Sequence, residues 1–141
     1  MAAGATVVLQ PRFDPVEYMR AIQEEKVTVA IVVPPFLFGW IMSVPEAMAF
    51  DASSVRVFAT AAATFPEELK RAVLKHMPNA GLYYTYGLTE SSGGNATVLY
   101  PDNAFRKGDS IGVVNPLLDY RIVNEAGEEV PVGEIGELLL K

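Results

Sequence analysis

The chain has 141 residues, of which half are hydrophobic and a fifth charged, and this composition excludes an intrinsically disordered chain. Its net charge of -6 argues against a nucleic-acid partner, because phosphate binding needs a basic surface and the eleven Lys and Arg residues are scattered. The chain has no cysteine and one histidine, which excludes disulfides, a thiolate nucleophile and a zinc site. The acidic, cysteine-free composition is typical of a cytoplasmic protein, and we expect that location.

The first predicted elements are two strands with a helix between them. Residues 6–9 are apolar and β-branched for the most part, so we expect a short strand there. The helix is predicted to follow Asp14 as its cap, with Pro15 in the first turn and Glu17 completing a capping box. Residues 27–33 form a β-branched run without polar alternation, which is typical of a strand covered on both faces.

The stretch from residue 27 to residue 44 has no charged side chain and is just long enough to raise the possibility of a membrane span. Pro34 and Pro35 lie in its middle and disfavour a continuous helix, because they remove two backbone donors. We therefore expect no membrane span. A separate helix is predicted over residues 37–48, interrupted near Pro45.

A further strand, helix and strand follow in the same order. We predict strands over residues 55–62 and 82–86, with a helix between them that begins at residues 64–67 and ends at Met77. Such alternation implies right-handed crossovers, so the predicted fold class is α/β, with a doubly wound, mostly parallel sheet flanked by helices. Ligands of such sheets bind beyond the carboxyl ends of the strands. Residues 60–63 and 86–90 lie at two of these ends.

After residue 95 the helical period disappears. Short strands are predicted over four segments, residues 96–100, 111–114, 118–124 and 135–140, and Ala126 and Gly127 form a hairpin-turn signal. This pattern indicates the beginning of a small β-barrel. We therefore divide the chain into an α/β subdomain over residues 1–94 and the truncated start of a β-barrel subdomain over residues 95–141.

The clearest chemical signal is the sequence Tyr-Gly-Leu-Thr-Glu at residues 86–90. It closes a hydrophobic run and opens a stretch rich in serine and glycine. Gly87 allows close approach to the backbone, and Thr89 and Glu90 offer a hydroxyl and a carboxylate, the pair needed to hold a phosphate oxygen and its magnesium ion. The motif therefore points to a nucleotide phosphate.

This motif resembles the Tyr-Gly-x-Thr-Glu motif of the adenylate-forming family, which includes acyl-CoA synthetases, luciferases and the adenylation domains of peptide synthetases. Three other segments resemble family motifs in the family's order. Residues 60–63 with the helix start at 66–69 are similar to the Ser-Gly-Gly-Ala loop, and residues 110–116 to a Gly-x-Val-Gly-x-Pro turn. Residues 130–138 match the Pro-x-Gly-Glu-x-Gly-Glu-Leu hairpin. Together these segments span nearly the whole chain.

The resemblance implies specific roles for the residues at the two strand ends. Thr89 and Glu90 would be the catalytic pair, Thr89 bonding a phosphate oxygen and Glu90 binding magnesium. Tyr86 would lie against the adenine, and Gly87 belongs to the same nucleotide-binding motif. On the other side of the adenine would lie the second strand end, formed by Thr60, Ala61, Ala62 and Ala63. Ala61 and Ala62 replace the family's glycines, and each added methyl group narrows the cleft or opposes a positive φ angle.

The same resemblance implies an activity. The parent protein would be an ATP-dependent acyl-CoA synthetase that activates a carboxylic acid, a fatty acid by expectation, as acyl-AMP. The acyl group would then pass to the thiol of coenzyme A or of a carrier protein, with ATP, Mg²⁺ and coenzyme A as cofactors. The family's helix after the diproline helps line the acyl pocket, so Phe36, Phe38 and Trp40 have two interpretations: substrate contacts or plain core packing.

The chain shows neither the upstream phosphate loop nor the downstream catalytic lysine of the family. We therefore expect a middle fragment of the large N-terminal domain of such an enzyme, inactive by itself and prone to self-association through uncovered apolar surface. The alternative is a non-catalytic nucleotide-binding or scaffolding module of the same fold.

Overall fold

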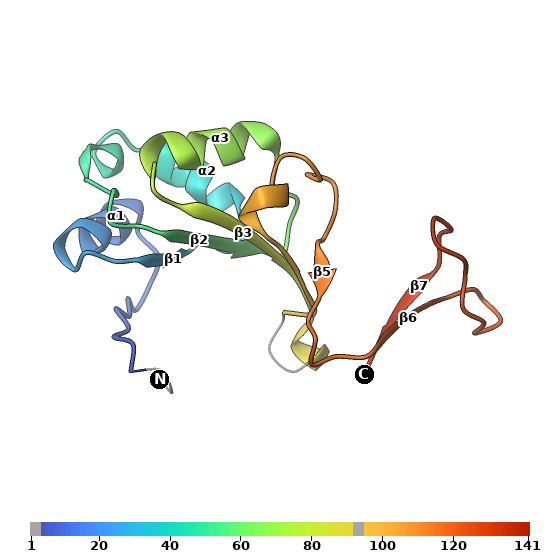
Figure 1. Cartoon of the computed structure of the whole chain (residues 1–141). Helices are drawn as coiled ribbons and strands as arrows, with labels where there is room; N and C mark the ends of the chain where they lie inside the picture. Colours follow the sequence, from blue (N-terminus) through green and yellow to red (C-terminus); the bar gives the residue numbers. More distant parts are fainter. Residues whose placement is uncertain (1–3, 92–94) are drawn as a thin grey trace.

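The computed structural model describes residues 4–91 and 95–141, and these residues form two sheets (Figure 1). The larger sheet is mixed: its first two strand pairs are parallel and its last two antiparallel. Its strands, in spatial order, are β1 (Val29–Ile31), β2 (Val57–Ala61), β3 (Gly81–Tyr86), β4 (Thr97–Leu99) and β5 (Val113–Val114). The smaller sheet pairs β6 (Tyr120–Val123) antiparallel with β7 (Glu137–Leu140). The predicted α/β class is confirmed.

The helices connect the strands of the larger sheet. They are α1 (Pro15–Glu24), α2 (Phe36–Met42) and α3 (Glu67–His76), with 3₁₀ turns η1 (Ala47–Ala49), η2 (Thr89–Ser91) and η3 (Pro101–Asn103). The predicted helix over residues 37–48 is divided into α2 and η1, as expected from Pro45. Among the described residues, none of these helices combines the length and the hydropathy that crossing a bilayer would require.

Helix α1 begins where the sequence predicts. One carboxylate oxygen of Asp14 accepts hydrogen bonds from the backbone N–H groups of Val16 and Glu17, at 2.9 and 3.0 Å. These bonds satisfy donors that have no partner within the helix. Met19 and Ile22, three residues apart on the same face, are buried. The cap and the apolar spacing together fix both the start of the helix and the face that packs.

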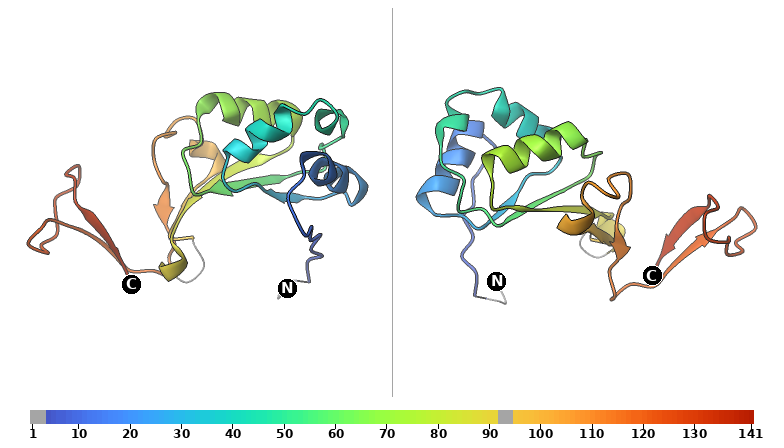
Figure 2. Two further views of the ribbon diagram at one scale, coloured as in Figure 1. Left: turned by 180° about the vertical axis from the view of Figure 1, so that it is seen from behind. Right: turned by 45° about the horizontal axis from the view of Figure 1, so that its top comes forward.

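One face of the larger sheet carries the hydrophobic core. Figure 1 shows α2 and α3 lying over β2 and β3 on the same side. Phe58 of β2 is central to the core. The centre of its ring lies 5.5 Å from that of Phe38, in an edge-to-face arrangement, and 6.0 Å from that of Phe65, in a stacked one. Residues of all three α-helices contribute to this single cluster. Figure 2 shows the arrangement of the helices and the sheet from behind and with the top turned forward. Burial of large aromatic side chains supplies much of the stabilisation of such a core.

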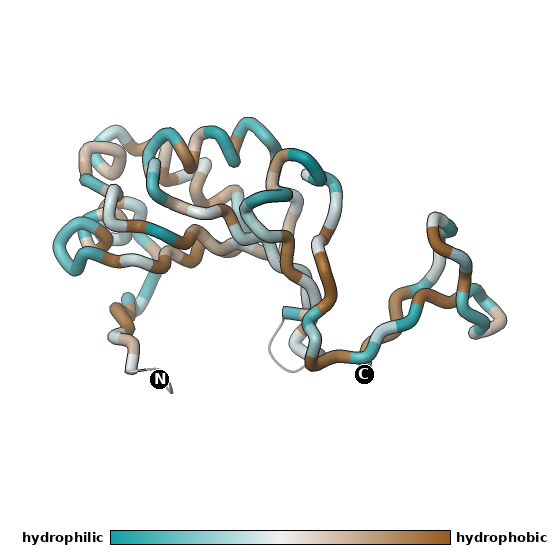
Figure 3. The backbone as a smooth tube through the Cα atoms, in the orientation of Figure 1, coloured by the Kyte–Doolittle hydropathy of each residue, from teal (hydrophilic) through white to brown (hydrophobic). Residues whose placement is uncertain are grey.

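The opposite face of β1 is open. Val29 is 51% exposed and Ile31 63%, whereas Ala30 and Val32 between and beside them are buried. The prediction that residues 27–33 are covered on both faces is therefore wrong for the described residues, because every α-helix packs on the same side. The hydropathy colouring shows the apolar stretch along this edge of the sheet (Figure 3).

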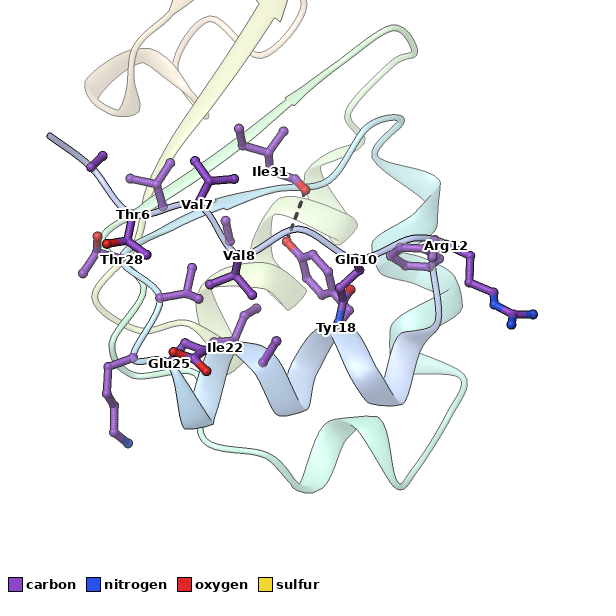
Figure 4. A pocket seen from close by; sticks show the side chains of 17 residues that line it. Thr6, Val7, Val8, Gln10, Arg12, Tyr18, Ile22, Glu25, Thr28 and Ile31 are labelled. Atoms are coloured by element: carbon purple, nitrogen blue, oxygen red, sulfur yellow. Dashed lines mark hydrogen bonds between the residues drawn. The ribbon is translucent and has the colours of Figure 1, made fainter. Parts of the chain in front are cut away.

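The predicted strand at residues 6–9 is also wrong. This segment and β1 line the same hollow (Figure 4), but no described backbone hydrogen bond joins the two. A strand requires a ladder of such bonds, so β-branched side chains alone do not create one. Leu9 is 87% exposed, which removes the packing that would hold the segment in place.

The C-terminal strands are close to their predicted positions. β4 and β5 extend the larger sheet, and Gly112 permits their approach: it has a φ angle of +94°, and a Cβ there would lie 2.1 Å from the carbonyl oxygen of Val98. The predicted turn at Ala126 and Gly127 is present, with Gly127 at a φ angle of +79°. Because β4 and β5 join the sheet of β1 to β3, the division at residues 94 and 95 stays a prediction.

Candidate functional site

The candidate site lies where β2 and β3 end. These strands run in parallel, and Ala61 pairs with Thr85. Ala62, the first residue after β2, and Tyr86, the last residue of β3, are therefore neighbours at one edge of the sheet. Sequence reasoning predicted this meeting of two strand ends, and the strand register confirms it.

Thr89 and Glu90 follow β3 in the short turn η2, which Figure 1 shows beyond the end of that strand. Both residues are exposed, so neither side chain is turned into the core. Glu90 forms no ion pair or hydrogen bond with another described residue. A hydroxyl and a free carboxylate are thus presented to solvent at the sheet edge, which is compatible with binding a phosphate and its metal ion.

Tyr86 is the last residue of β3 and pairs with Thr97 of β4. Tyr86 and Gly87 are partly buried, so both residues stay accessible to a ligand at this edge of the sheet. Their proximity to Ala62 and Ala63 agrees with a flat ligand held between the two strand ends. The specific contacts of each residue with a nucleotide stay predictions.

The loop after β2 contains a residue with a positive φ angle, at a position where alanine replaces the family's glycine. Ala62 adopts a φ angle of +71°, in the left-handed region that glycine occupies without cost. The added methyl group therefore does not prevent this conformation, although it is strained for an L-residue. Ala61 and Ala63 are partly buried and Ala62 is exposed, which leaves the loop backbone accessible.

Thr60 lies apart from the other predicted site residues. It is only 1% exposed, and its hydroxyl donates a hydrogen bond to the backbone carbonyl of Val32. The side chain therefore points into the helix-covered face and links β2 to the segment after β1. A contact of Thr60 with a nucleotide stays a prediction, and its observed hydrogen bond is structural.

The donor set suits a magnesium ion only if a ligand completes it. Within residues 4–91 and 95–141, no group of three or more acidic or histidine side chains could hold a metal. Mg²⁺ is commonly bound by one or two carboxylates together with substrate phosphates. Glu90 as a single exposed carboxylate fits this second arrangement, in which the nucleotide brings the remaining oxygen ligands.

Two hollows in the described part of the chain lie away from residues 86–90. The first, of about 770 Å³, lies between residues 5–10, α1 and β1 (Figure 4). There the hydroxyl of Tyr18 donates to the backbone carbonyl of Ile31 at 3.2 Å, and burial raises the pKa of Tyr18. The second, of about 800 Å³, lies between the start of α3 and residues 104–111.

The second hollow contains a residue that sequence reasoning missed. Lys70 is 3% exposed, although a charged side chain on a surface helix is expected to face water. The spacing carried the signal: Lys70, Val73 and Met77 recur at intervals of three and four residues, and all three are buried. A long aliphatic stem lets lysine occupy an apolar stripe, so its charge alone did not exclude it.

The aromatic residues after the diproline divide between the two interpretations. Phe38 is fully buried and belongs to the core, whereas Phe36 is 64% exposed and Trp40 50% exposed. The ring of Trp40 packs against that of Phe13, with 5.4 Å between the ring centres. Core packing therefore explains Phe38, and the exposed rings of Phe36 and Trp40 stay available for other contacts.

Comparison with known proteins agrees with this geometry. The family model of the AMP-binding enzymes matches residues 1–141. The chain is 36% identical to 4-coumarate–CoA ligase 4 of Arabidopsis thaliana, over 100% of this chain and 25% of that protein. It is also 36% identical to indoleacetate–CoA ligase of Aromatoleum aromaticum, over 100% of this chain and 27% of that protein. It thus spans about a quarter of the length of these relatives.

Solved structures give the same result. The N-terminal domain of FACL13 from Mycobacterium tuberculosis superimposes with a TM-score of 0.81 at 32% identity, covering 94% of this chain and 32% of that one. The anthranilate CoA ligase AuaEII in complex with anthranoyl-AMP superimposes with a TM-score of 0.83 at 25% identity, covering 98% of this chain and 26% of that one. The chain belongs to the family of AMP-binding enzymes.

Proposed function

We propose that these residues form the adenine and magnesium side of an ATP-dependent acid–thiol ligase, which activates a carboxylic acid as acyl-AMP and transfers it to coenzyme A. The observation that carries the proposal is the position of Thr89 and Glu90, exposed in the turn that follows β3, whose end is paired with the end of β2. Membership of the AMP-binding family supports it.

Each residue has a defined part in the proposal. The hydroxyl of Thr89 donates to a phosphate oxygen, and the carboxylate of Glu90 holds the magnesium ion. The ring of Tyr86 and the backbone of residues 61–63 hold the adenine between the two strand ends. When bound, Mg²⁺ neutralises phosphate charge, which favours attack by an anionic carboxylate.

The nature of the acid is a finer part of the proposal. Relatives are named for 4-coumarate and for indoleacetate, and one solved neighbour is named a fatty acyl CoA synthetase. A fatty acid is therefore one candidate, and an acid with an aromatic body is another. Exposed Phe36 and Trp40 after the diproline are the side chains we propose to select between them. We also propose coenzyme A rather than a carrier protein as the acceptor, and the cytoplasm as the location.

A nucleotide titration tests the proposal directly. We expect the chain to bind ATP more tightly with Mg²⁺ than without it, as measured by calorimetry. Glu90→Gln should abolish the effect of Mg²⁺, because the amide cannot replace the carboxylate as a charged ligand. Glu125→Gln removes the same charge from an exposed turn and should change nothing. Binding of ATP that is equally sensitive to Mg²⁺ in all three proteins would contradict the assignment of Glu90.

We further propose that the 141 residues alone do not catalyse. They span about a quarter of the relatives' length, and loss of a single transition-state donor already costs about 100- to 1000-fold in rate. An assay of ATP–pyrophosphate exchange with a panel of aromatic and fatty acids should give background rates. Exchange above background would instead show that these residues form a complete site.

The open face of the sheet leads to the last part of the proposal, which is self-association. Val29 and Ile31 present apolar side chains on an edge strand, and such edges pair with other chains. Ile31→Lys places a charge there and should shift the sedimentation profile towards monomer. Leu117→Lys alters an exposed apolar side chain of a turn and serves as the control. A wild-type chain that sediments as monomer at high concentration would refute self-association.

A further inference from the structure

The hollow between α3 and residues 104–111 is separate from the candidate nucleotide site. Its volume is about 800 Å³, which is within the range of small-molecule sites. The lining residues come from the segment before and at the start of α3, from residues 104–111, and from β3, which contributes Tyr84. None of residues 86–90 lines it.

A buried cation lies in this hollow. The ammonium group of Lys70 donates to the carbonyl oxygens of Ala104 at 2.9 Å and of Gly108 at 3.4 Å, and lies 5.7 Å from the centre of the Phe65 ring. No carboxylate among the described residues forms an ion pair with it. Burial lowers the pKa of Lys70, against the opposing effect of Asp109 and Glu67. An ammonium group has three donors, so one stays available to a ligand.

The lining of the hollow is more positive than the rest of the chain. Three basic side chains, Lys70, Arg106 and Lys107, face two acidic ones, Glu67 and Asp109, in a chain with a net charge of -6. Glu67 is also ion-paired to Arg71, outside the lining, which reduces its effect on the hollow. A buried charge without an opposite charge is unfavourable, and an anionic ligand would supply the missing partner.

The remaining walls are apolar. Phe65, Tyr84, Phe105 and Ile111 line the hollow, and the three aromatic rings favour a flat apolar body. The hydroxyl of Tyr84 has no hydrogen-bond partner among the described residues, so it can donate to an anion in the same space. One end of a ligand would thus meet the cation and the hydroxyl, and its body would meet the rings.

From these observations we infer that the hollow binds a small organic carboxylate, its anionic group on Lys70 and its apolar body between Phe65, Tyr84 and Phe105. This is a second site, beyond the proposed ligase function and independent of it. It would take a ligand even if residues 86–90 bound no nucleotide.

Titration of the 141-residue chain with benzoate, followed by ¹H–¹⁵N spectra, tests the inference. Benzoate should produce saturable shifts of the backbone amides of residues 64–70 and 104–111. Benzamide has the same shape without the charge and should bind at least about tenfold more weakly. Equal binding of benzamide, shifts confined to other residues, or no saturable shift would each overturn the inference.

Variants separate the charge of Lys70 from other features. Lys70→Met keeps an aliphatic stem of similar length and should weaken benzoate binding by at least about tenfold. Lys75→Met alters an exposed lysine of the same helix and should leave binding unchanged. If Lys70→Met does not fold, as judged by circular dichroism, the comparison of benzoate with benzamide on the wild-type chain decides. A folded Lys70→Met that binds benzoate normally would contradict the role of the ammonium group.

Discussion

The two faces of the larger sheet differ although the same strands build them. On one face Ala30, Phe58 and Leu82 are buried beneath the helices, whereas on the other Val29 and Ile31 are exposed. Apolar side chains on the first face stabilise this chain, and those on the second do so only when something covers them. The difference teaches that apolar composition of a strand does not identify which of its residues hold the fold together.

The strongest test of this comparison exchanges a large side chain on each face. Phe58→Ala removes a fully buried ring from the aromatic cluster and should lower the free energy of unfolding by about 3–5 kcal/mol. Ile31→Ala, on the open face, should lower it by less than about 1 kcal/mol, because the side chain is 63% exposed. Urea unfolding of both variants provides the measurement. Similar losses would show that the open face is covered in solution.

A smaller effect is expected from removing one hydroxyl on each face. Thr60→Val deletes a buried hydrogen bond and leaves the carbonyl of Val32 without that partner, so unfolding should become easier by about 1–3 kcal/mol. The hydroxyl of Thr85 on the open face lies 3.5 Å from the carbonyl of Thr60, a long contact. Thr85→Val should therefore change the urea midpoint little. A larger change in the urea midpoint for Thr85→Val than for Thr60→Val would contradict the assignment of Thr60 to the buried face and Thr85 to the open face.

The loop that follows β2 offers a third test. Ala62→Gly removes the strain of a positive φ angle, whereas the larger backbone entropy of glycine in the unfolded chain opposes this gain. The net effect should be to raise the free energy of unfolding by about 0.5–1 kcal/mol. Ala63 has no positive φ angle, so Ala63→Gly should destabilise by a similar amount. Thermal unfolding of both variants distinguishes them. If Ala62→Gly also destabilises, the alanine is not strained.

The smallest expected effect depends on pH. Burial lowers the pKa of His76, with Asp51 and a backbone hydrogen bond to Phe50 opposing, and the Nε2 atom has no partner among the described residues. The unfolded chain therefore binds a proton that the folded chain does not, and stability should fall as pH drops below the ordinary histidine value of about 6.5.

His76→Leu should remove this pH dependence, because the chain has one histidine. Urea midpoints between neutral pH and the range in which carboxylates titrate provide the measurement. An unchanged pH dependence in His76→Leu would assign the effect to other groups.

Much of the fold follows from local sequence. Asp14 and Pro15 fix the start of α1, Pro45 divides the helix after the diproline, and Gly127 marks the turn. Each of these signals acts through backbone geometry within a few residues, so no knowledge of the tertiary structure is needed. The parallel order of β1 to β3 also follows, because strands joined by single helices have few alternatives.

Other features depend on what packs against a segment, which local patterns do not contain. Val29 and Ile31 read as buried because their residue types favour burial, but the helices lie on the other face. Val7 and Val8 favour a strand but have no ladder to join. The meeting of Ala62 with Tyr86 was predictable from parallel strands, whereas the inward hydroxyl of Thr60 depended on strand register. The burial of Lys70 was not predicted, because a lysine is expected to face solvent and its spacing from Val73 and Met77 was given less weight than its charge.

The contact between Gly112 and Val98 restricts how the surface segment before it can vary. At this position any side chain would collide with the neighbouring backbone, and the φ angle adds a second requirement for glycine. The preceding residues 105–109 are largely solvent-facing, so a change in their length or chemistry would alter the hollow beside Lys70 without disturbing the sheet. An engineer could therefore graft a new recognition segment there while the point of re-entry into the sheet stays fixed.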